Sequence, residues 1–504
     1  MDKTVISQHL FIFPFTWKLV GKRKTALFLP QRQINDSVFE KLNNWELIYQ
    51  KVQEDKDYNE FVYYYKPIRA ALYTLNKGPI IVRNYEYNQL EKDNYFIVQV
   101  EGKEYDLSLT GLRLKLYKTG IGLLFIEVSN KQYKELEEIE RINSFSKCIY
   151  PPMLPLEKAR EELFPDGIRI KLNAHDKLEE FFKEDYHQKV VSISPLILGI
   201  LGKPFIGKEE RDKGKKLLIE PVLGNQMFSL CLYKNKVLVE QIKREQQVLR
   251  ALEAFLDNNK KHISTLQTEE KRSLGINTYL QTENAIYGMS RFSLLCLVQH
   301  VPAMKLYDQM ITLVVMQHTT LLNLSTEISR VSALPPEELV PAIKSLYEIY
   351  IQFINQLYFK EITEDTEGAQ IYESLSKQFK IGEELQQLDF EINEVHQYAM
   401  LIEQSNSRVK VEILTIVGAA LVLPTFATGF FGMNIFKEEI TNWWRYRNVA
   451  LWINTYVFLP ILVTLILWSW NRRKNRCNRF KKIGLILLFL ISLSFILKYG
   501  CGLK

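Results

Sequence analysis

Three consecutive residues, Gly432, Met433 and Asn434, end a long apolar run with a set of oxygen acceptors that suits a divalent cation. The Asn434 side chain offers a neutral amide oxygen, and Gly432 permits the turn that exposes backbone carbonyls at a helix C-terminus. The negative end of a helix dipole also favours a cation there. Because Mg²⁺ releases its hydration water reluctantly, neutral oxygens can hold the hydrated ion. We therefore expect Asn434 to bind a metal ion.

The elements around this tripeptide predict a membrane hairpin. Residues 414–434 contain no charged side chain, and about 20 residues at 1.5 Å each span about 30 Å, the thickness of the hydrocarbon core. A second uncharged run of spanning length covers residues 449–470, and residues 435–448 form a short connection. We predict transmembrane helix 1 at 414–434, an outer loop at 435–448 and transmembrane helix 2 at 449–470.

A basic segment, residues 471–482, follows the second run and contains no acidic residue. Its cations are Arg472, Arg473, Lys474, Arg476, Arg479, Lys481 and Lys482. They account for the formal net charge of +7, so the rest of the chain is close to neutral and no direct nucleic-acid binding is expected. The positive-inside rule places this segment in the cytoplasm and the tripeptide outside. The prediction is a multi-pass protein of the cell inner (plasma) membrane with a cytoplasmic N-terminal domain.

A third apolar stretch, residues 483–499, leaves two alternatives open. Its first 15 residues, Ile483 to Leu497, are apolar on every face, which disfavours an interfacial helix. Either it crosses the membrane, with Lys498 reaching the interface, or both chain ends stay in the cytoplasm.

The part before the membrane predicts an α+β cytosolic domain followed by long helices. Residues 1–235 contain short β-rich runs, which predict a cytosolic α/β domain. The expected strands include His9–Thr16, Glu60–Tyr65, Tyr95–Val100, Leu123–Val128, Leu217–Val222 and Met227–Tyr233. From Lys236 onward no strand is expected, and residues 236–368 are predicted to form a helical domain. Its helices are expected at 237–256, at 290–331 with a break at Val301 and Pro302, and at 336–359.

Residues 369–413 are predicted to form a stalk helix that enters the membrane. Apolar positions alternate spacings of three and four, as in a coiled coil. They are Leu385, Leu388, Ile392, Val395, Ala399, Ile402, Asn406, Val409 and Ile413. No Gly or Pro lies between Glu383 and Gly418, so one continuous rod is expected. The alternative is an amphipathic helix packed on its own domain.

This order of elements resembles the CorA family of divalent-cation channels. The resemblance covers about residues 383–482: a long stalk helix, a first spanning helix ending in Gly-Met-Asn, a short outer loop, a second spanning helix and a basic cluster. It implies a homopentamer in which five copies of the first helix line one pore. The permeant ion would be Mg²⁺ or another divalent cation, Gly432, Met433 and Asn434 would select it, and no cofactor is implied.

The same resemblance assigns a pore face to the first spanning helix. Leu414, Gly418, Val422, Thr425 and Gly429 share one face, and Leu414 and Val422 would gate the pore by dewetting. The alternative for the small residues is close helix packing.

Two acidic residues of the outer loop, Glu438 and Glu439, either attract cations or are ordinary solvated charges.

Enzymatic motifs are absent from the sequence, so an ion channel or transporter is expected and not an enzyme. It contains no P-loop, HExxH or G-x-S-x-G pattern. The seven histidines show no metal-ligand spacing, and His396 on the stalk is interpreted as a solvated residue. Five widely spaced cysteines predict no disulfide framework.

The enlarged N-terminal part and its opening HLFIFPFTW are similar to the CorA-like membrane effectors that accompany type III CRISPR systems. This similarity implies a ligand-gated antiviral channel opened by a nucleotide second messenger, an adenylated S-adenosylmethionine (SAM-AMP), whose binding residues the sequence does not identify. An adenine nucleotide would suit the aromatic-rich N-terminal part, although core packing explains the same aromatics. The alternatives are a housekeeping Mg²⁺ uptake transporter closed by cytosolic Mg²⁺ and a non-conducting membrane scaffold.

Overall fold

The computed structural model describes most of the chain up to Gly432 and parts of the C-terminal segment. The described residues are 5–20, 34, 37–40, 42–76, 78–88, 90, 93–147, 165–173, 177–182, 193–207, 216–223, 226–244, 278–282, 284–299, 304–432, 451, 453–459, 461–463, 466 and 478–500. They divide into two compact units, Met1–Gln397 and Tyr398–Lys504.

The first unit is built around strand β1 (Ser7–Val20), which is long and apolar. It pairs antiparallel with β6 (Ile121–Asn130), with β11 (Phe228–Lys234) and, along its second half, with β10 (Lys216–Pro221). Ten of the fourteen residues of β1 are buried, at both odd and even positions. A near-continuous apolar run of this kind is typical of a strand covered on both faces.

Fourteen strands of the described residues form one sheet, ordered β12-β13-β14-β11-β1-β6-β5-β4-β7-β8 along its main path. Off this path, β3 pairs with β5 and β2 with β3, whereas β10 pairs with β1 and β9 with β10. The remaining strands are β2 (Trp45–Ile48), β3 (Val82–Tyr87), β4 (Tyr95–Val100), β5 (Lys103–Tyr117), β7 (Gly167–Lys171), β8 (Lys177–Phe181), β9 (Phe205–Ile206), β12 (Thr278–Gln281), β13 (Ala285–Met289) and β14 (Ser293–Val298). The β11/β14 and β9/β10 pairs are parallel, and the others are antiparallel.

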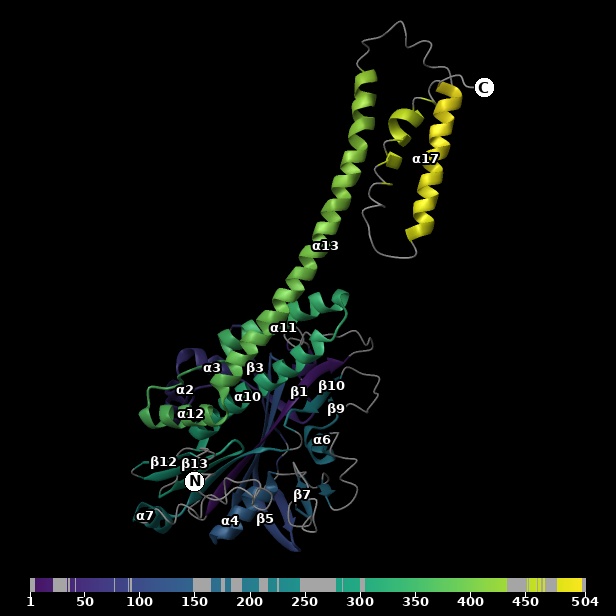
Figure 1. The fold of residues 1–504 in the computed structure, drawn as a ribbon. Coiled ribbons are helices and arrows are strands. Elements are labelled where there is room, and N and C mark those ends of the chain that lie inside the picture. Colours follow the sequence, from purple (N-terminus) through teal and green to yellow (C-terminus); the bar gives the residue numbers. More distant parts are fainter. Residues whose placement is uncertain are drawn as a thin grey trace, which may run out of the picture. The chain divides into compact units, whose positions relative to one another are not determined.

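Helices cover both faces of this sheet. On one face, α4 (Leu136–Ser146) and α6 (Pro195–Leu201) contribute Ile142 and Ile197 to the core that also holds Phe11 and Phe13. On the other face lies α10 (Met304–Ser332), which contacts β1, β6 and β11. The helices α11 (Pro336–Gln356) and α12 (Thr366–Gln378) in turn pack on α10 (Figure 1). The shorter helices are η1 (Ser37–Glu40), α2 (Asp55–Tyr63), α3 (Lys66–Leu72) and α7 (Lys236–Arg244).

The prediction of an α+β domain followed by long helices is confirmed, but two local predictions are wrong. Residues Glu60–Tyr65 were expected to form a strand, whereas residues up to Tyr63 belong to α2. The reciprocal hydrogen bonds between Glu54 and Asp57 at its start favour a helix over the β propensity of the tyrosines. Strands were also not expected after Lys236, yet β12, β13 and β14 complete the sheet.

One helix, α13 (Ile381–Gly432), runs for 52 residues and belongs to the first unit at its start and to the second at its end. The expected continuous rod is therefore present, although it begins at Ile381, after a separate helix α12, and not at residue 369.

The apolar positions of α13 that were predicted to form a coiled coil are buried in one stretch and exposed in another. Leu388 and Ile392 are buried in the first unit, and Asp389 beside them accepts a hydrogen bond from the Tyr350 hydroxyl of α11 at 2.7 Å. His396, expected to be solvated, stacks on Tyr347 of α11 with ring centroids 4.4 Å apart. The alternative of an amphipathic helix packed on its own domain therefore holds for this stretch. Further along, Asn406, Val409 and Ile413 are exposed.

The second unit contains further helical segments. Residues 453–459 are helical and include a π-type turn, η4 (Asn454–Phe458), and α17 covers Asn478–Gly500. The 23 residues of α17 correspond to about 34 Å of helix.

Candidate functional site

The C-terminal half of α13 has an apolar surface that its own chain leaves uncovered. Among the described residues, α13 is the one helix long and apolar enough to cross a membrane, and only 6% of its apolar window is buried. Leu414 is 72% exposed, Val422 is 64% exposed and Phe426 is 71% exposed. A soluble helix normally buries such a face, so lipid or another protein surface must cover this one.

The predicted pore-face residues lie together on this part of α13. A Cβ built on Gly418 or on Gly429 meets no atom within 4 Å. The Thr425 hydroxyl donates a hydrogen bond to the Leu421 carbonyl at 2.7 Å, beside Pro424 in the same turn. Because the chain's own atoms leave Gly418 and Gly429 open, these small residues leave room for close approach by another helix.

The structure describes only some of the other predicted site residues. Gly432 is the last residue of α13. Met433, Asn434, Glu438, Glu439, Arg472, Arg473, Lys474 and Arg476 lie outside the described residues. Arg479, Lys481 and Lys482 belong to the first turns of α17.

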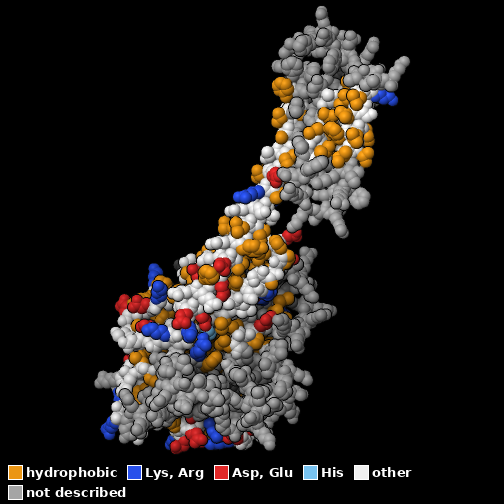
Figure 2. All heavy atoms as spheres, in the orientation of Figure 1, with side chains coloured by type: hydrophobic (Ala, Val, Ile, Leu, Met, Phe, Trp, Pro, Cys, Tyr) orange, Lys and Arg blue, Asp and Glu red, His pale blue; other side chains and the backbone are white. Residues whose placement is uncertain are grey.

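From Ile483 to Leu497, α17 is apolar around its circumference apart from Ser492 and Ser494, as its sequence predicts. Ile486, Leu488, Ile491 and Leu493 are all at least 37% exposed and lie on different sides of the helix, and hydrophobic side chains gather on its visible face (Figure 2). A helix that is apolar on all sides requires a nonpolar environment.

A reciprocal pair of hydrogen bonds joins η4 to α17. The Asn454 amide donates to the Ser492 carbonyl at 2.9 Å, and the Ser492 hydroxyl donates to the Asn454 side-chain oxygen at 2.8 Å. Polar side chains of this kind connect helices in a membrane, where water cannot replace the hydrogen bonds. The sequence interpretation did not identify this pair, because each residue is an isolated polar position in an apolar run.

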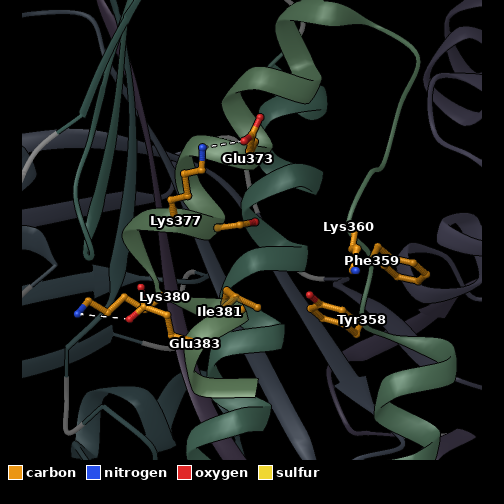
Figure 3. Close-up of a pocket in the computed structure, with 10 residues that line it drawn as sticks. Tyr358, Phe359, Lys360, Glu373, Lys377, Lys380, Ile381 and Glu383 are labelled. Atoms are coloured by element: carbon orange, nitrogen blue, oxygen red, sulfur yellow. Dashed lines mark ion pairs between the residues drawn. The ribbon is translucent and has the colours of Figure 1, made fainter. Parts of the chain in front are cut away.

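The start of α13 forms a sharp joint with α12. Lys380 has a φ of 52°, in the left-handed region that favours glycine, and separates the two helices. Beside the joint is a cavity of about 300 Å³ (Figure 3). Tyr358, Phe359 and Lys360 of the α11–α12 loop line one side, and Lys377 of α12 and Lys380 of the joint line the other. Lys377 points to Glu373 of its own helix at 2.7 Å, and Lys380 points to Glu383 in the first turn of α13 at 3.7 Å.

Next to this joint in the sequence, the Glu384 carboxylate contacts residues of α10 and of the β13–β14 turn and so connects the first turns of α13 to the rest of the first unit. Glu384 Oε2 lies 3.0 Å from His318 Nδ1 of α10, and Glu384 Oε1 lies 3.6 Å from Arg291 in the β13–β14 turn. Phe379 packs against His318 and against Phe228 of β11. These contacts link α13 to α10 and to the sheet.

The aromatics of the opening segment serve the core of the first unit. Phe11, Phe13 and Phe15 are fully buried in the main core. The buried Tyr64 donates to the Leu306 carbonyl at 2.7 Å, and Tyr63 donates to Asp365 at 2.9 Å. The opening segment HLFIFPFTW is thus the central strand of the sheet.

The described residues contain no group of three or more His, Cys, Asp or Glu side chains that could hold a metal ion. No protein-family model matches the chain, and no curated protein matches it.

Proposed function

We propose that the protein is an oligomeric membrane channel of the CorA type, with a pore for Mg²⁺ or another divalent cation lined by the C-terminal half of α13. The observation that carries the proposal is the single helix Ile381–Gly432, which begins in contact with the sheet domain and ends in an exposed apolar face leading to the Gly-Met-Asn tripeptide. An ion channel needs such a connection between a regulatory domain and a pore.

In this proposal, five copies of α13 surround the pore and the segment 449–470 lies outside them. Leu414 and Val422 narrow the pore, and Gly418 and Gly429 allow the helices to approach. The amide of Asn434 and the carbonyls of Gly432 and Met433 hold the hydrated ion at the outer entrance. Glu438 and Glu439 attract cations to it, and the basic segment 471–482 fixes the second helix at the cytoplasmic side of the plasma membrane.

The segment α17 is a third crossing in this arrangement. The uncharged stretch of α17, residues 483–497, covers about 22 Å of helix, and Lys498 and the basic residues of the first turns reach the interfaces on either side of it. Its Ser492 bonds to Asn454 of the preceding segment. The C-terminus then lies outside the cell.

The sheet domain gates the pore in response to a ligand. Its size and its opening segment resemble effectors of type III CRISPR signalling, so we propose a nucleotide second messenger of the SAM-AMP type as the opening signal. The direct contacts of Glu384 with α10 and with the β13–β14 turn support transmission from the domain to α13.

The test is divalent-cation flux through purified protein in liposomes, at low and at millimolar internal Mg²⁺, with and without adenine-nucleotide second messengers. A ligand-gated effector is silent until one nucleotide is added. Flux that needs no nucleotide and stops as internal Mg²⁺ rises would instead identify a housekeeping transporter, and no flux under any condition would favour a scaffold.

A further inference from the structure

The predicted pore face of α13 continues before Leu414, toward the start of the helix. Residues that share one face of a helix recur at spacings of three and four. Five residues before Leu414 keep these spacings without a slip: Gln397, Met400, Gln404, Ser407 and Val411. We call these five residues the pre-Leu414 stripe. By spacing, the stripe and the predicted pore face form one line along the helix.

The side chains of the pre-Leu414 stripe are exposed. Met400 is 48% exposed and Val411 is 62% exposed, and the polar members Gln397, Gln404 and Ser407 are exposed as well. Ala399, one residue before Met400, is by contrast 3% exposed. The chain's own atoms therefore cover a different side of α13 and leave the stripe open.

The pre-Leu414 stripe is polar but carries no charge. Residues 397–413 of α13 include four exposed charged residues, and none of them belongs to the stripe: Glu403, Arg408, Lys410 and Glu412. A helix side that only meets water accepts charged residues as readily as neutral ones. Solvent exposure alone thus gives no reason for charge to be confined to the other sides.

A hollow of about 610 Å³ lies against this part of α13. Its described lining consists of Gln404, Ser407, Arg408, Val411 and Glu412. Arg408 and Glu412 lie four residues apart, where opposite charges offset each other. A Mg²⁺ ion with six waters, at about 30 Å³ per water, needs about 180 Å³. The hollow has room for such a hydrated ion beside Gln404 and Ser407.

The chemistry of Gln404 and Ser407 suits a hydrated divalent cation. The Gln404 amide and the Ser407 hydroxyl each present an oxygen acceptor. Water molecules bound to Mg²⁺ can donate hydrogen bonds to these oxygens, and the ion keeps its hydration shell. Conduction also requires that the ion leave its site, and neutral oxygens hold it less tightly than a ring of carboxylates would.

We propose that Gln404 and Ser407 form a second site for the hydrated divalent cation, on the cytosolic side of the Leu414 constriction. Ser407 precedes Leu414 by seven residues, or about 10 Å of helix, so an ion held there waits directly before the constriction. Each copy contributes one Gln404 and one Ser407, so the site is complete only in the oligomer. This inference rests on the proposed channel function and adds a site that the Gly-Met-Asn tripeptide does not include.

The test is the Mg²⁺ current through the purified full-length protein in planar bilayers, under the condition that opens the natural protein and in about 0.15 M monovalent salt. The Mg²⁺ concentration is varied on the side of the soluble domain. We expect Ser407→Glu to lower the half-saturating Mg²⁺ concentration about tenfold and Ser407→Lys to raise it about tenfold, because a ring of charges changes the local cation concentration. Gln404→Glu and Gln404→Lys should give the same pair of opposite shifts. A merely structural role of either residue would not produce shifts whose direction follows the sign of the charge.

Ser405 provides the matched control. It is the same residue type as Ser407, is also exposed, and is rotated from it by about 200° around the helix. At this salt concentration, charges that lie farther away than about 8 Å are largely screened, so Ser405→Glu and Ser405→Lys should leave the half-saturating concentration unchanged.

Two results would overturn the second site while leaving the channel function standing. One is a natural protein that conducts Mg²⁺ together with unchanged half-saturation in the Ser407 and Gln404 variants. The other is equal shifts at Ser405 and Ser407, which would indicate a general effect of surface charge. A natural protein that carries no Mg²⁺ current under any condition would instead refute the channel function and, with it, this site.

Discussion

Glu384 Oε2 on the first turns of α13 lies 3.0 Å from His318 Nδ1 in the middle of α10, although 66 residues separate them in the sequence. The contact is partly buried, with His318 at 7% exposure, and Arg291 approaches the same carboxylate. It is a direct link between the helix that leads to the candidate pore and the helix that covers the sheet.

Replacing Glu384 should weaken this link. In Glu384→Ala, we expect a loss of about 1–3 kcal/mol in the free energy of unfolding, because a partly buried charged hydrogen bond disappears. Hydrogen exchange of residues 381–392 should accelerate. The control is Glu383→Ala. The Glu383 side chain is 76% exposed, and among the described residues its ion pair is with Lys380 at 3.7 Å. Equal exchange in both variants would show that Glu384 does not hold α13.

Lys380 provides a test of the joint between α12 and α13. Its φ of 52° costs about 1–2 kcal/mol for a residue with a Cβ atom, and glycine avoids this cost. Since glycine also increases the entropy of the unfolded chain, we expect Lys380→Gly to stabilise the protein by about 0.5–1 kcal/mol. Lys380→Ala keeps the Cβ and should give no such gain in denaturant unfolding. Stabilisation by alanine equal to that by glycine would show that the lost charge, not the backbone, is responsible.

Lys115 should make the stability of the sheet domain depend on pH. Burial lowers its pKa to about 7 in the folded protein from 10.5 in the unfolded chain. Between these values the unfolded chain binds more protons, so stability rises as the pH increases from 7 toward 10.5. Lys115→Met removes this contribution.

The variant's stability relative to the natural protein should therefore be about 2–3 kcal/mol more favourable at pH 7 than at pH 9.5. Denaturant titrations at the two pH values measure the difference, and comparison within each pH cancels other titrating groups. If the difference in unfolding free energy between the variant and the natural protein is the same at both pH values, Lys115 is not neutral above pH 7.

The fold was predictable where local pattern and tertiary environment agree. The strand around His9–Thr16 and the helix after Pro336 follow from apolar runs and from a proline at the helix start. The strands β13 and β14 were missed because their short, fully buried apolar runs look the same as a buried helix.

The sites were less predictable, because distant segments build them. Arg113 and Lys115 read as ordinary alternating residues of a strand until Asp308 and Gln309, nearly 200 residues later, face them. Which of the periodic apolar positions of α13 are buried likewise depends on the position of α11, and the periodicity of the sequence does not reveal that position.

The Asn454–Ser492 pair tests whether α17 packs on the preceding segment. Ser492→Ala removes one hydrogen bond and should reduce stability in detergent by about 0.6–1.7 kcal/mol. Ser494→Ala, on the same helix but exposed, is the matched control and should have little effect. In a double-mutant cycle with Asn454→Ala, strictly additive losses would contradict the pairing.

The most direct test of the channel is divalent-cation flux through liposomes that contain Asn434→Ala, compared with the natural protein under the condition that opens it. The control is Asn442→Ala, the same substitution eight residues further along the predicted outer loop. The account predicts that Asn434→Ala abolishes Mg²⁺ flux and that Asn442→Ala retains it. Undiminished flux in Asn434→Ala would contradict a pore whose entrance is formed by the Gly-Met-Asn tripeptide.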